Sequence, residues 1–301
     1  MIDLRRLHVL RVLREEGTVT ATARALHLTP SAVSQQLRQL AADVGAELLN
    51  HEGRRVALTS AAHVLLGHAD TIAAEWERTR ADLAEHSDGA AGRVRIAGFA
   101  SSFGSLLVPA AARVREANPR LEVSLAETDI DQGLRRLLAG RADIAVLPVP
   151  GTPPLDDPRF DQRILLRDRQ DLVVWTGHRL AGRDAVELAE TASEDWIAPH
   201  HDQHELIRVA CAAAGFTPRV AHEAAEWSCV LSLVEGGFGV CLLPALAGVA
   251  AHRGLVRIPL LGEPAPARSV LTCVRRGSRA QPAIAVVMAA LEDAARRVSS
   301  G

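Results

Sequence analysis

Apolar residues recur every three or four positions along the first 60 residues, whereas from about residue 93 short apolar runs alternate with helical stretches. The first pattern predicts a small helical unit, because one turn of helix takes 3.6 residues. The second predicts strands that alternate with helices, and therefore an α/β domain with a largely parallel sheet. Between them, a run from Thr59 to about Glu85 has apolar positions near heptad spacing, which predicts one long helix. We therefore expect a helical N-terminal part followed by an α/β part.

The segment 29–38 has a strong helix start signal. Thr29 is a good N-cap, and Pro30 falls at the first helical position, where its missing N–H is harmless. Val33, Leu37 and Leu40 repeat at helical spacing and should face a core. The opposite face carries hydroxyls, an amide and a guanidinium, and no carboxylate: Ser31, Ser34, Gln35 and Arg38. These groups suit a DNA major groove, because Gln can pair with adenine and Arg with guanine or phosphate.

The neighbouring segments extend this interpretation. Thr18 can cap a helix over 19–26, and the tight turn at 27–28 would complete a helix-turn-helix. Residues 44–59 then predict a β-hairpin wing with Gly53 at its turn, where Arg54 and Arg55 could contact phosphates or the minor groove. From the residues alone, two Ala-rich core helices and a solvated loop remain the alternatives.

Composition adds little about partners. The 301 residues suggest about two domains, and the net charge of −2 gives no global sign of nucleic-acid binding. Residues 1–60 hold eight arginines and six acidic residues, a local excess of +2. No apolar run approaches the ~20 residues of a membrane span, and no signal peptide is visible, so we expect a cytoplasmic protein and no membrane partner.

The chain resembles the LysR-type transcriptional regulators. The N-terminal match runs through Gly17-Thr18, Ala23, Leu26-His27-Leu28-Thr29, Ala32-Val33-Ser34-Gln35-Gln36-Leu37, Leu40, Gly45, Leu48, Arg55 and Leu58-Thr59. Looser matches follow in order at 119–125, 140–145, 214–216 and 235–240. The sequence departs from the family at Pro30-Ser31, where the family often has Gln-Pro, and at Ala41, Leu49, His51 and Ala62. These departures concern the preferred DNA sequence rather than the fold.

The resemblance implies three parts. Residues 1–59 would form a winged helix-turn-helix DNA-binding domain, and 60–91 a dimerising linker helix with a hinge. Residues 92–301 would form an effector-binding domain like a periplasmic binding protein, with subdomain I at about 92–165 and 268–301 and subdomain II at about 166–267. The residues expected to contact double-stranded DNA are Thr18, Thr20, Thr29, Ser31, Ala32, Ser34, Gln35, Arg38, Arg54 and Arg55. Those expected to pair two subunits, rather than pack on their own domain, are Leu65, Ile72, Trp76 and Leu83.

An effector site is expected where strands end. In open α/β sheets, ligands bind at the carboxyl ends of strands, and nearby helix N-termini favour anions. We therefore expect a small, anionic effector. Simple N-capping is the alternative for any single hydroxyl. The expected contacts are Ser101, Ser102, Phe103, Thr128, Pro199, His200, His201 and Trp227.

Other chemistry has less support. His201 and His204 have a spacing that could chelate a metal, yet surface histidines or an anion contact explain them better, so we expect no metal and no cofactor. No hydrolase or phosphate-loop motif occurs, which argues against an enzyme. The four cysteines, Cys211, Cys229, Cys241 and Cys273, should be buried free thiols; redox sensing by Cys229 and Cys241 is the alternative.

The sequence thus predicts a transcriptional regulator that acts as a homodimer or homotetramer, with RNA polymerase as a further partner. The alternatives are a redox-responsive regulator of the same kind and a cytoplasmic α/β protein that binds a small molecule without DNA.

Overall fold

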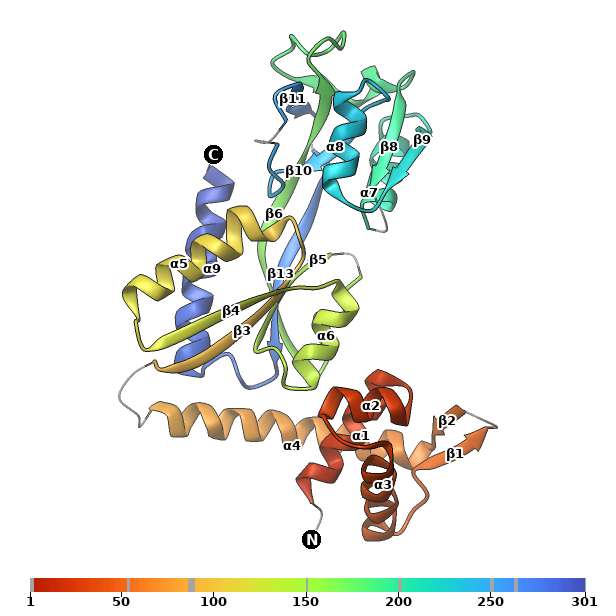
Figure 1. Cartoon of the computed structure of the whole chain (residues 1–301), viewed down its shortest axis with the longest axis vertical. Coiled ribbons are helices and arrows are strands. Elements are labelled where there is room, and N and C mark those ends of the chain that lie inside the picture. Colours follow the sequence, from red (N-terminus) through yellow and green to blue (C-terminus); the bar gives the residue numbers. More distant parts are fainter. Residues whose placement is uncertain are drawn as a thin grey trace.

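The computed structural model describes residues 3–52, 55–85, 90–149, 151–199, 202–249, 252–262 and 265–300. Figure 1 shows a small helical unit at one end, a long helix beside it, and two α/β lobes stacked beyond. We call these lobes the middle lobe, which contains β3, β4 and β5, and the upper lobe, which contains β8 and β9.

The N-terminal unit contains three helices and a hairpin. Each helix has the side-chain cap that the sequence favours: Asp3 accepts from the Arg5 N–H, Thr18 from that of Ala21, and Thr29 from that of Ala32. Apolar side chains from all three helices and from the start of the long helix meet in one core. The tip of the hairpin at 53–54 lies outside the described residues. The elements are α1 (Leu4–Glu16), α2 (Val19–Leu26), α3 (Pro30–Val44), β1 (Leu49–Glu52) and β2 (Arg55–Leu58).

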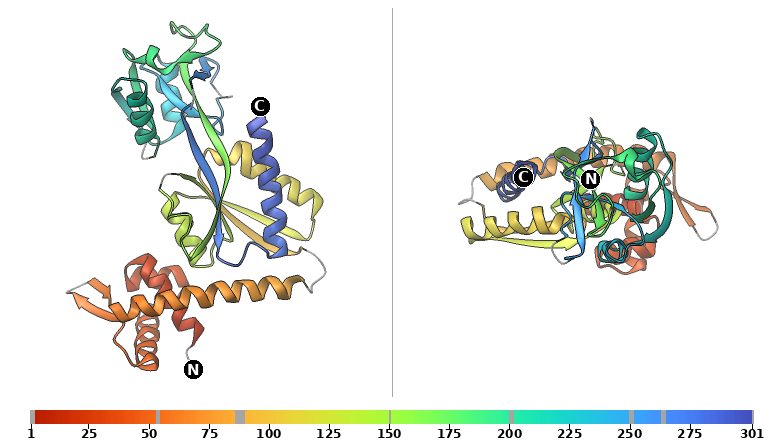
Figure 2. Two further views of the ribbon diagram at one scale, coloured as in Figure 1. Left: turned by 180° about the vertical axis from the view of Figure 1, so that it is seen from behind. Right: turned by 90° about the horizontal axis from the view of Figure 1, so that it is seen from above.

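The long helix α4 (Ser60–Glu85) joins this unit to the rest of the chain. It runs beneath the middle lobe in both side views (Figures 1 and 2). Buried Glu77 fixes it there, since its carboxylate accepts from Arg275 Nε and from Gln281 Nε2, each at 2.6 Å. The backbone of α4 also lies close to that of Gly277, since a Cβ added to Gly277 would lie 2.3 Å from the Ala74 carbonyl oxygen.

The middle lobe is a sheet between two helical layers. Successive residues of a strand point to opposite faces. In β5, Ile144 and Val146 pack towards α5 and α9, whereas Ala145 and Leu147 pack towards α6. Figure 2 shows α9 and α6 on opposite sides of this sheet. A π-helical turn at 103–107 leads into α5. The elements are β3 (Gly92–Gly98), α5 (Val108–Ala117), β4 (Leu121–Glu127), α6 (Ile130–Leu138), β5 (Ile144–Val149) and α9 (Pro282–Ser300).

Two long strands, β6 (Phe160–Trp175) and β13 (Ala267–Arg275), run from the middle lobe into the upper lobe. Strand β6 is long and continuous, because no Gly or Pro interrupts it. The sheet is mixed rather than largely parallel. β3 pairs parallel with β4 and β5, but β13 pairs antiparallel with both β5 and β6.

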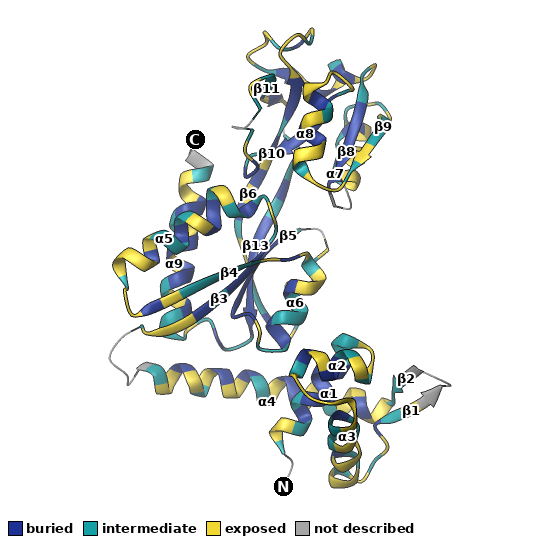
Figure 3. Cartoon of the chain, viewed as in Figure 1, coloured by how far each residue is buried: buried dark blue, intermediate teal, exposed yellow. Residues whose placement is uncertain are grey.

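The upper lobe surrounds Trp196, which is fully buried. Its two apolar clusters lie on either side of the end of β6, as the dark strands in Figure 3 indicate. The elements are β7 (Val186–Glu187), a short 3-10 helix (Leu188–Thr191), β8 (Asp195–Pro199), α7 (Asp202–Ala213), β9 (Arg219–Ala224), α8 (Trp227–Glu235), β10 (Cys241–Pro244), β11 (Leu255–Ile258) and β12 (Leu260–Leu261).

Candidate functional site

Helix α3 presents a polar face to solvent. Val33, Leu37 and Leu40 hold the other side of the helix in the core, with 0%, 2% and 0% exposure. This leaves Gln35 and Arg38 exposed, and neither has a hydrogen bond or an ion pair among the described residues. Both side chains are therefore available to an outside partner.

The remaining predicted DNA contacts surround this face, apart from the wing. Hydroxyl groups lie at both helix starts, and the Thr29 and Ser31 hydroxyls are 3.0 Å apart. Thr18 and Thr20 are exposed at the start of α2, whereas Ala32 and Ser34 are partly buried. Arg54 lies outside the described residues, and the side chain of Arg55 is not described.

The charge of α3 fits a negative partner. Its single carboxylate, Asp43, lies at the far end of the helix and is already engaged by Gln39 and Arg6. The hydrogen bond from Gln39, with that from Arg6, holds the pKa of Asp43 below its ordinary value. The carboxylate therefore stays ionised and paired, away from Gln35 and Arg38.

Helix α4 carries an exposed apolar row. Ile72, Trp76 and Leu83 are 41%, 55% and 63% exposed, as a docking face requires. Leu65 is different, since it packs against the core of its own N-terminal unit. Val64, which is 66% exposed, takes the outward position expected for Leu65.

Ion pairs also tie α1 to the middle lobe. Arg159 Nη1 lies 2.8 Å from Glu15 Oε1, and Arg141 Nη2 lies 3.7 Å from Glu16 Oε1. Next to them, burial and then the charges of Arg11 and Arg275 lower the pKa of His8. The N-terminal unit thus contacts the middle lobe directly as well as through α4.

A second candidate site is a cavity of about 720 Å³ between the two lobes. Of the predicted effector contacts, Ser101, Pro199 and Trp227 line it. His200 and His201 lie outside the described residues. Among the described residues, the cavity is lined by Phe99, Ala100, Ser101, Glu127, Asp129, Ile130, Asp131, Pro148, Gly151, Pro199, Gln203, Ala225, Glu226, Trp227 and Arg268.

Three predicted contacts do not line the cavity. Ser102 is fully buried and donates to the Phe99 carbonyl at 2.6 Å. Phe103 begins the π-helical turn and packs against the core of the middle lobe. Thr128 is 6% exposed, and a Cβ on Gly133 would lie 3.3 Å from its hydroxyl. These three side chains turn into the protein rather than into the cavity.

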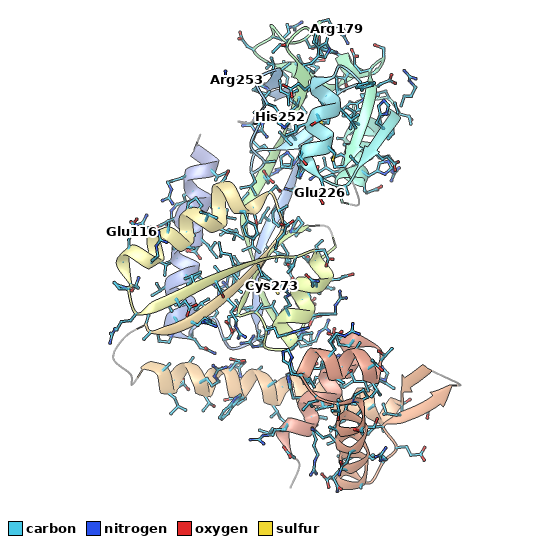
Figure 4. The ribbon with its side chains drawn as sticks, viewed as in Figure 1. Glu116, Arg179, Glu226, His252, Arg253 and Cys273 are labelled. Carbon is cyan, nitrogen blue, oxygen red and sulfur yellow. The ribbon has the colours of Figure 1, made fainter. Side chains whose placement is uncertain are left out.

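Gln203, Glu226 and Arg268 line the cavity without having been predicted from the sequence. Arg268 lies 167 residues from Ser101, to which its Nη2 donates at 2.9 Å, so no local pattern could reveal it. Glu226 immediately precedes α8, and Figure 4 places it at the edge of the upper lobe that faces the middle lobe. The sequence signal for Glu226 as a cavity residue was its position directly before a helix.

Arg268 forms a buried ion pair at the base of the cavity. Its Nε lies 2.9 Å from Asp168 Oδ2, and the two side chains are 4% and 0% exposed. The guanidinium also stacks over Phe99, 4.9 Å from the ring centre. Burial raises the pKa of Asp168 although Arg268 opposes the shift. The positive charge of Arg268 is thus paired with Asp168 inside the protein.

The cysteines do not form an evident redox pair. All four are free, and Cys229 is exposed, contrary to the expectation that all would be buried. Burial raises the pKa of Cys241 to about 12 and that of Cys211 to about 12, which disfavours the reactive thiolate. Within the described ranges, no group of three or more His, Cys, Asp or Glu side chains could hold a metal ion.

Family models match both parts of the chain. Residues 4–63 match the bacterial regulatory helix-turn-helix protein of the lysR family, and residues 87–296 match the LysR substrate binding domain. The regulator ShiR of Corynebacterium glutamicum is 27% identical over 265 residues, covering 86% of this chain and 88% of ShiR. OxyR of Escherichia coli K12, a DNA-binding dual regulator, is 26% identical over 284 residues, covering 92% and 90%.

Solved structures agree with the fold. A full-length OxyR variant from Pseudomonas aeruginosa has a TM-score of 0.73 at 15% identity, covering 98% of this chain and 97% of that one. Full-length CbnR in complex with its target DNA has a TM-score of 0.57 at 22% identity, covering 99% of each chain. In the described part of the chain, no helix is long and apolar enough to cross a membrane.

Proposed function

The chain belongs to the LysR family of DNA-binding transcriptional regulators, and we propose that it reads its operator through the exposed face of α3. Gln35 and Arg38 carry this proposal: neither has a hydrogen bond or an ion pair among the described residues, so both can bond to base edges or phosphates. Thr18, Thr20, Thr29, Ser31 and Ser34 would contact the phosphates nearby.

The test is operator affinity in full-length variants. Gln35→Ala and Arg38→Ala should each weaken specific binding by about 1–3 kcal/mol, the usual value of a base contact. Gln39→Ala is the matched control, since Gln39 lies on the same helix but bonds to Asp43. The duplex would come from genomic fragments selected by the wild-type protein. If both variants kept wild-type operator affinity, the assigned face would be wrong.

We propose that two copies associate through α4. The exposed row of Val64, Ile72, Trp76 and Leu83 supports this, because such a row gains stability only when a partner covers it. A dimer would present two copies of α3 to successive turns of the major groove, ~34 Å apart. Tetramers and a contact with RNA polymerase are further proposals for the assembled regulator.

We propose that a small effector binds in the cavity between the lobes and biases the arrangement of the DNA-binding units. The cavity supports this because residues of both lobes line it, so a ligand can favour one relative position of the lobes. The ion pairs from Arg159 and Arg141 to α1 would carry the change to the DNA-binding unit.

A further inference from the structure

The cavity between the lobes is acidic. Four carboxylates line it: Glu127, Asp129 and Asp131 from the middle lobe and Glu226 from the upper lobe. Among the described residues, none of the four forms an ion pair, and all are exposed. Arg268 is the one cation among the described lining residues, and it is paired with Asp168. This charge does not favour the anionic effector expected from the sequence.

Two of the four carboxylates have structural tasks. Asp129 caps α6 by accepting from the Gln132 N–H at 2.7 Å, and Asp131 lies in the first turn of that helix, where a negative charge is favourable. Glu127 and Glu226 differ. Glu127 ends β4, and Glu226 occupies the N-cap position of α8 without making a side-chain cap. Neither carboxylate has a described structural role, and they come from opposite lobes.

Gln203 gives independent evidence for a ligand. Its side chain is 2% exposed and lines the same cavity. Both its amide nitrogen and its amide oxygen lack a hydrogen-bond partner among the described residues. Leaving such a buried group without a hydrogen bond is unfavourable, so a bound molecule that bonds to it would gain affinity.

Aromatic side chains complete the site. Trp227 and Phe99 both line the cavity, and the ring of Phe99 already stacks with a guanidinium. An aromatic face attracts a cation through its quadrupole, and Trp does so best. A cavity lined by carboxylates from both lobes and by the Trp227 ring is suited to an organic cation.

We propose that the effector is an organic cation, with an ammonium or guanidinium group held between Glu127 and Glu226 and a hydrogen-bonding group at Gln203. The inference rests on the proposed effector role of this cavity. It also gives a physical cause for the response. Without a cation, the two carboxylates repel when the lobes approach; with one, both are attracted to it, and lobe closure is favoured.

The test compares small cations with an anion on the full-length protein. Putrescine and agmatine supply ammonium and guanidinium groups, and glutarate is a dianion of similar length. Binding would be measured by calorimetry at low salt. We expect both cations to bind and glutarate not to bind. Glu226→Gln and Glu127→Gln should each weaken the cations about tenfold to a hundredfold, as for a lost hydrogen bond to a charged group.

Glu223→Gln is the matched control, because Glu223 is an exposed glutamate on β9 of the same lobe and does not line the cavity. Glutarate binding, or cation binding that survives both glutamine variants, would overturn the inference, as would the absence of cation binding at millimolar concentration. A separate assay tests the proposed function: if cations bind through Glu226 yet operator binding does not change, the ligand class stands and the effector role fails.

Discussion

Removal of the Arg268 guanidinium should destabilise the effector domain through the carboxylate that it leaves behind. The Asp168 side chain is 0% exposed, and besides Arg268 it accepts from the Leu246 N–H at 3.1 Å. Removing one partner of a buried ion pair costs about 3–5 kcal/mol, because the other charge remains in a poorly solvated place. We expect Arg268→Met to lower the free energy of unfolding by about this amount at neutral pH.

The loss should depend on pH with a defined sign. Burial already raises the pKa of Asp168, and loss of Arg268 should raise it further. When the pKa of a carboxyl group is higher in the folded than in the unfolded protein, its charge destabilises the folded state. The full penalty applies at pH values above the folded-state pKa. This penalty falls as the pH drops from the folded pKa towards the unfolded one, by about 1.4 kcal/mol per pH unit. The loss in free energy of unfolding caused by Arg268→Met should therefore shrink in mild acid. Adding Asp168→Asn to this variant should reduce the loss at neutral pH.

The assay is urea unfolding at fixed protein concentration, followed by tryptophan fluorescence. Three of the four tryptophans, Trp175, Trp196 and Trp227, belong to the effector domain, and Trp76→Phe in every variant would make the signal report the unfolding of that domain alone. Arg163→Met is the control, because that side chain is 65% exposed and should change stability by no more than about 0.5 kcal/mol. If Arg268→Met lowered the free energy of unfolding by less than about 1 kcal/mol, or by an amount that does not change with pH, the unpaired Asp168 charge would not be the cause.

Three further predictions follow from burial. Trp76→Asp should dissociate dimers in sedimentation velocity, whereas Glu75→Gln, also exposed on α4, should not; unchanged association of the Trp76 variant would exclude α4 as the interface. Iodoacetamide at neutral pH should label Cys229 and spare Cys241, as read by mass spectrometry; rapid labelling of Cys241 in the native protein would contradict its burial. Leu40→Ala should destabilise the N-terminal unit by about 2–5 kcal/mol, measured as lost amide-exchange protection; full protection would contradict a tightly packed core.

The N-terminal unit could be predicted well because its signals are local. Thr18 and Thr29 cap the helices that follow them, and Val33 and Leu37 mark the buried face at helical spacing. Each of these features lies within one or two turns of the element it defines. The sequence pattern therefore predicted both the helices and their exposed faces.

The cavity between the lobes was harder to predict because its parts meet only in the folded chain. Ser101 and Ser102 were both expected to contact the effector, but only Ser101 lines the cavity, because Ser102 is buried and its hydroxyl donates to the Phe99 carbonyl. The pairing of Arg268 with Asp168 joins positions 100 residues apart. Consequently the predicted charge of the effector followed from helix N-termini alone and missed the carboxylates of Glu127 and Glu226.

We propose that this chain binds a specific DNA sequence through the exposed face of α3. The most direct measurement is a salt titration of the full-length protein on a duplex selected from genomic fragments, against a shuffled duplex of equal length. We predict tighter binding to the selected duplex and a log–log salt slope of about −0.9 for each phosphate neutralised. Arg38→Ala should remove most of the preference between the two duplexes. Equal affinity of the wild-type protein for both duplexes at every salt concentration would contradict sequence-specific DNA binding.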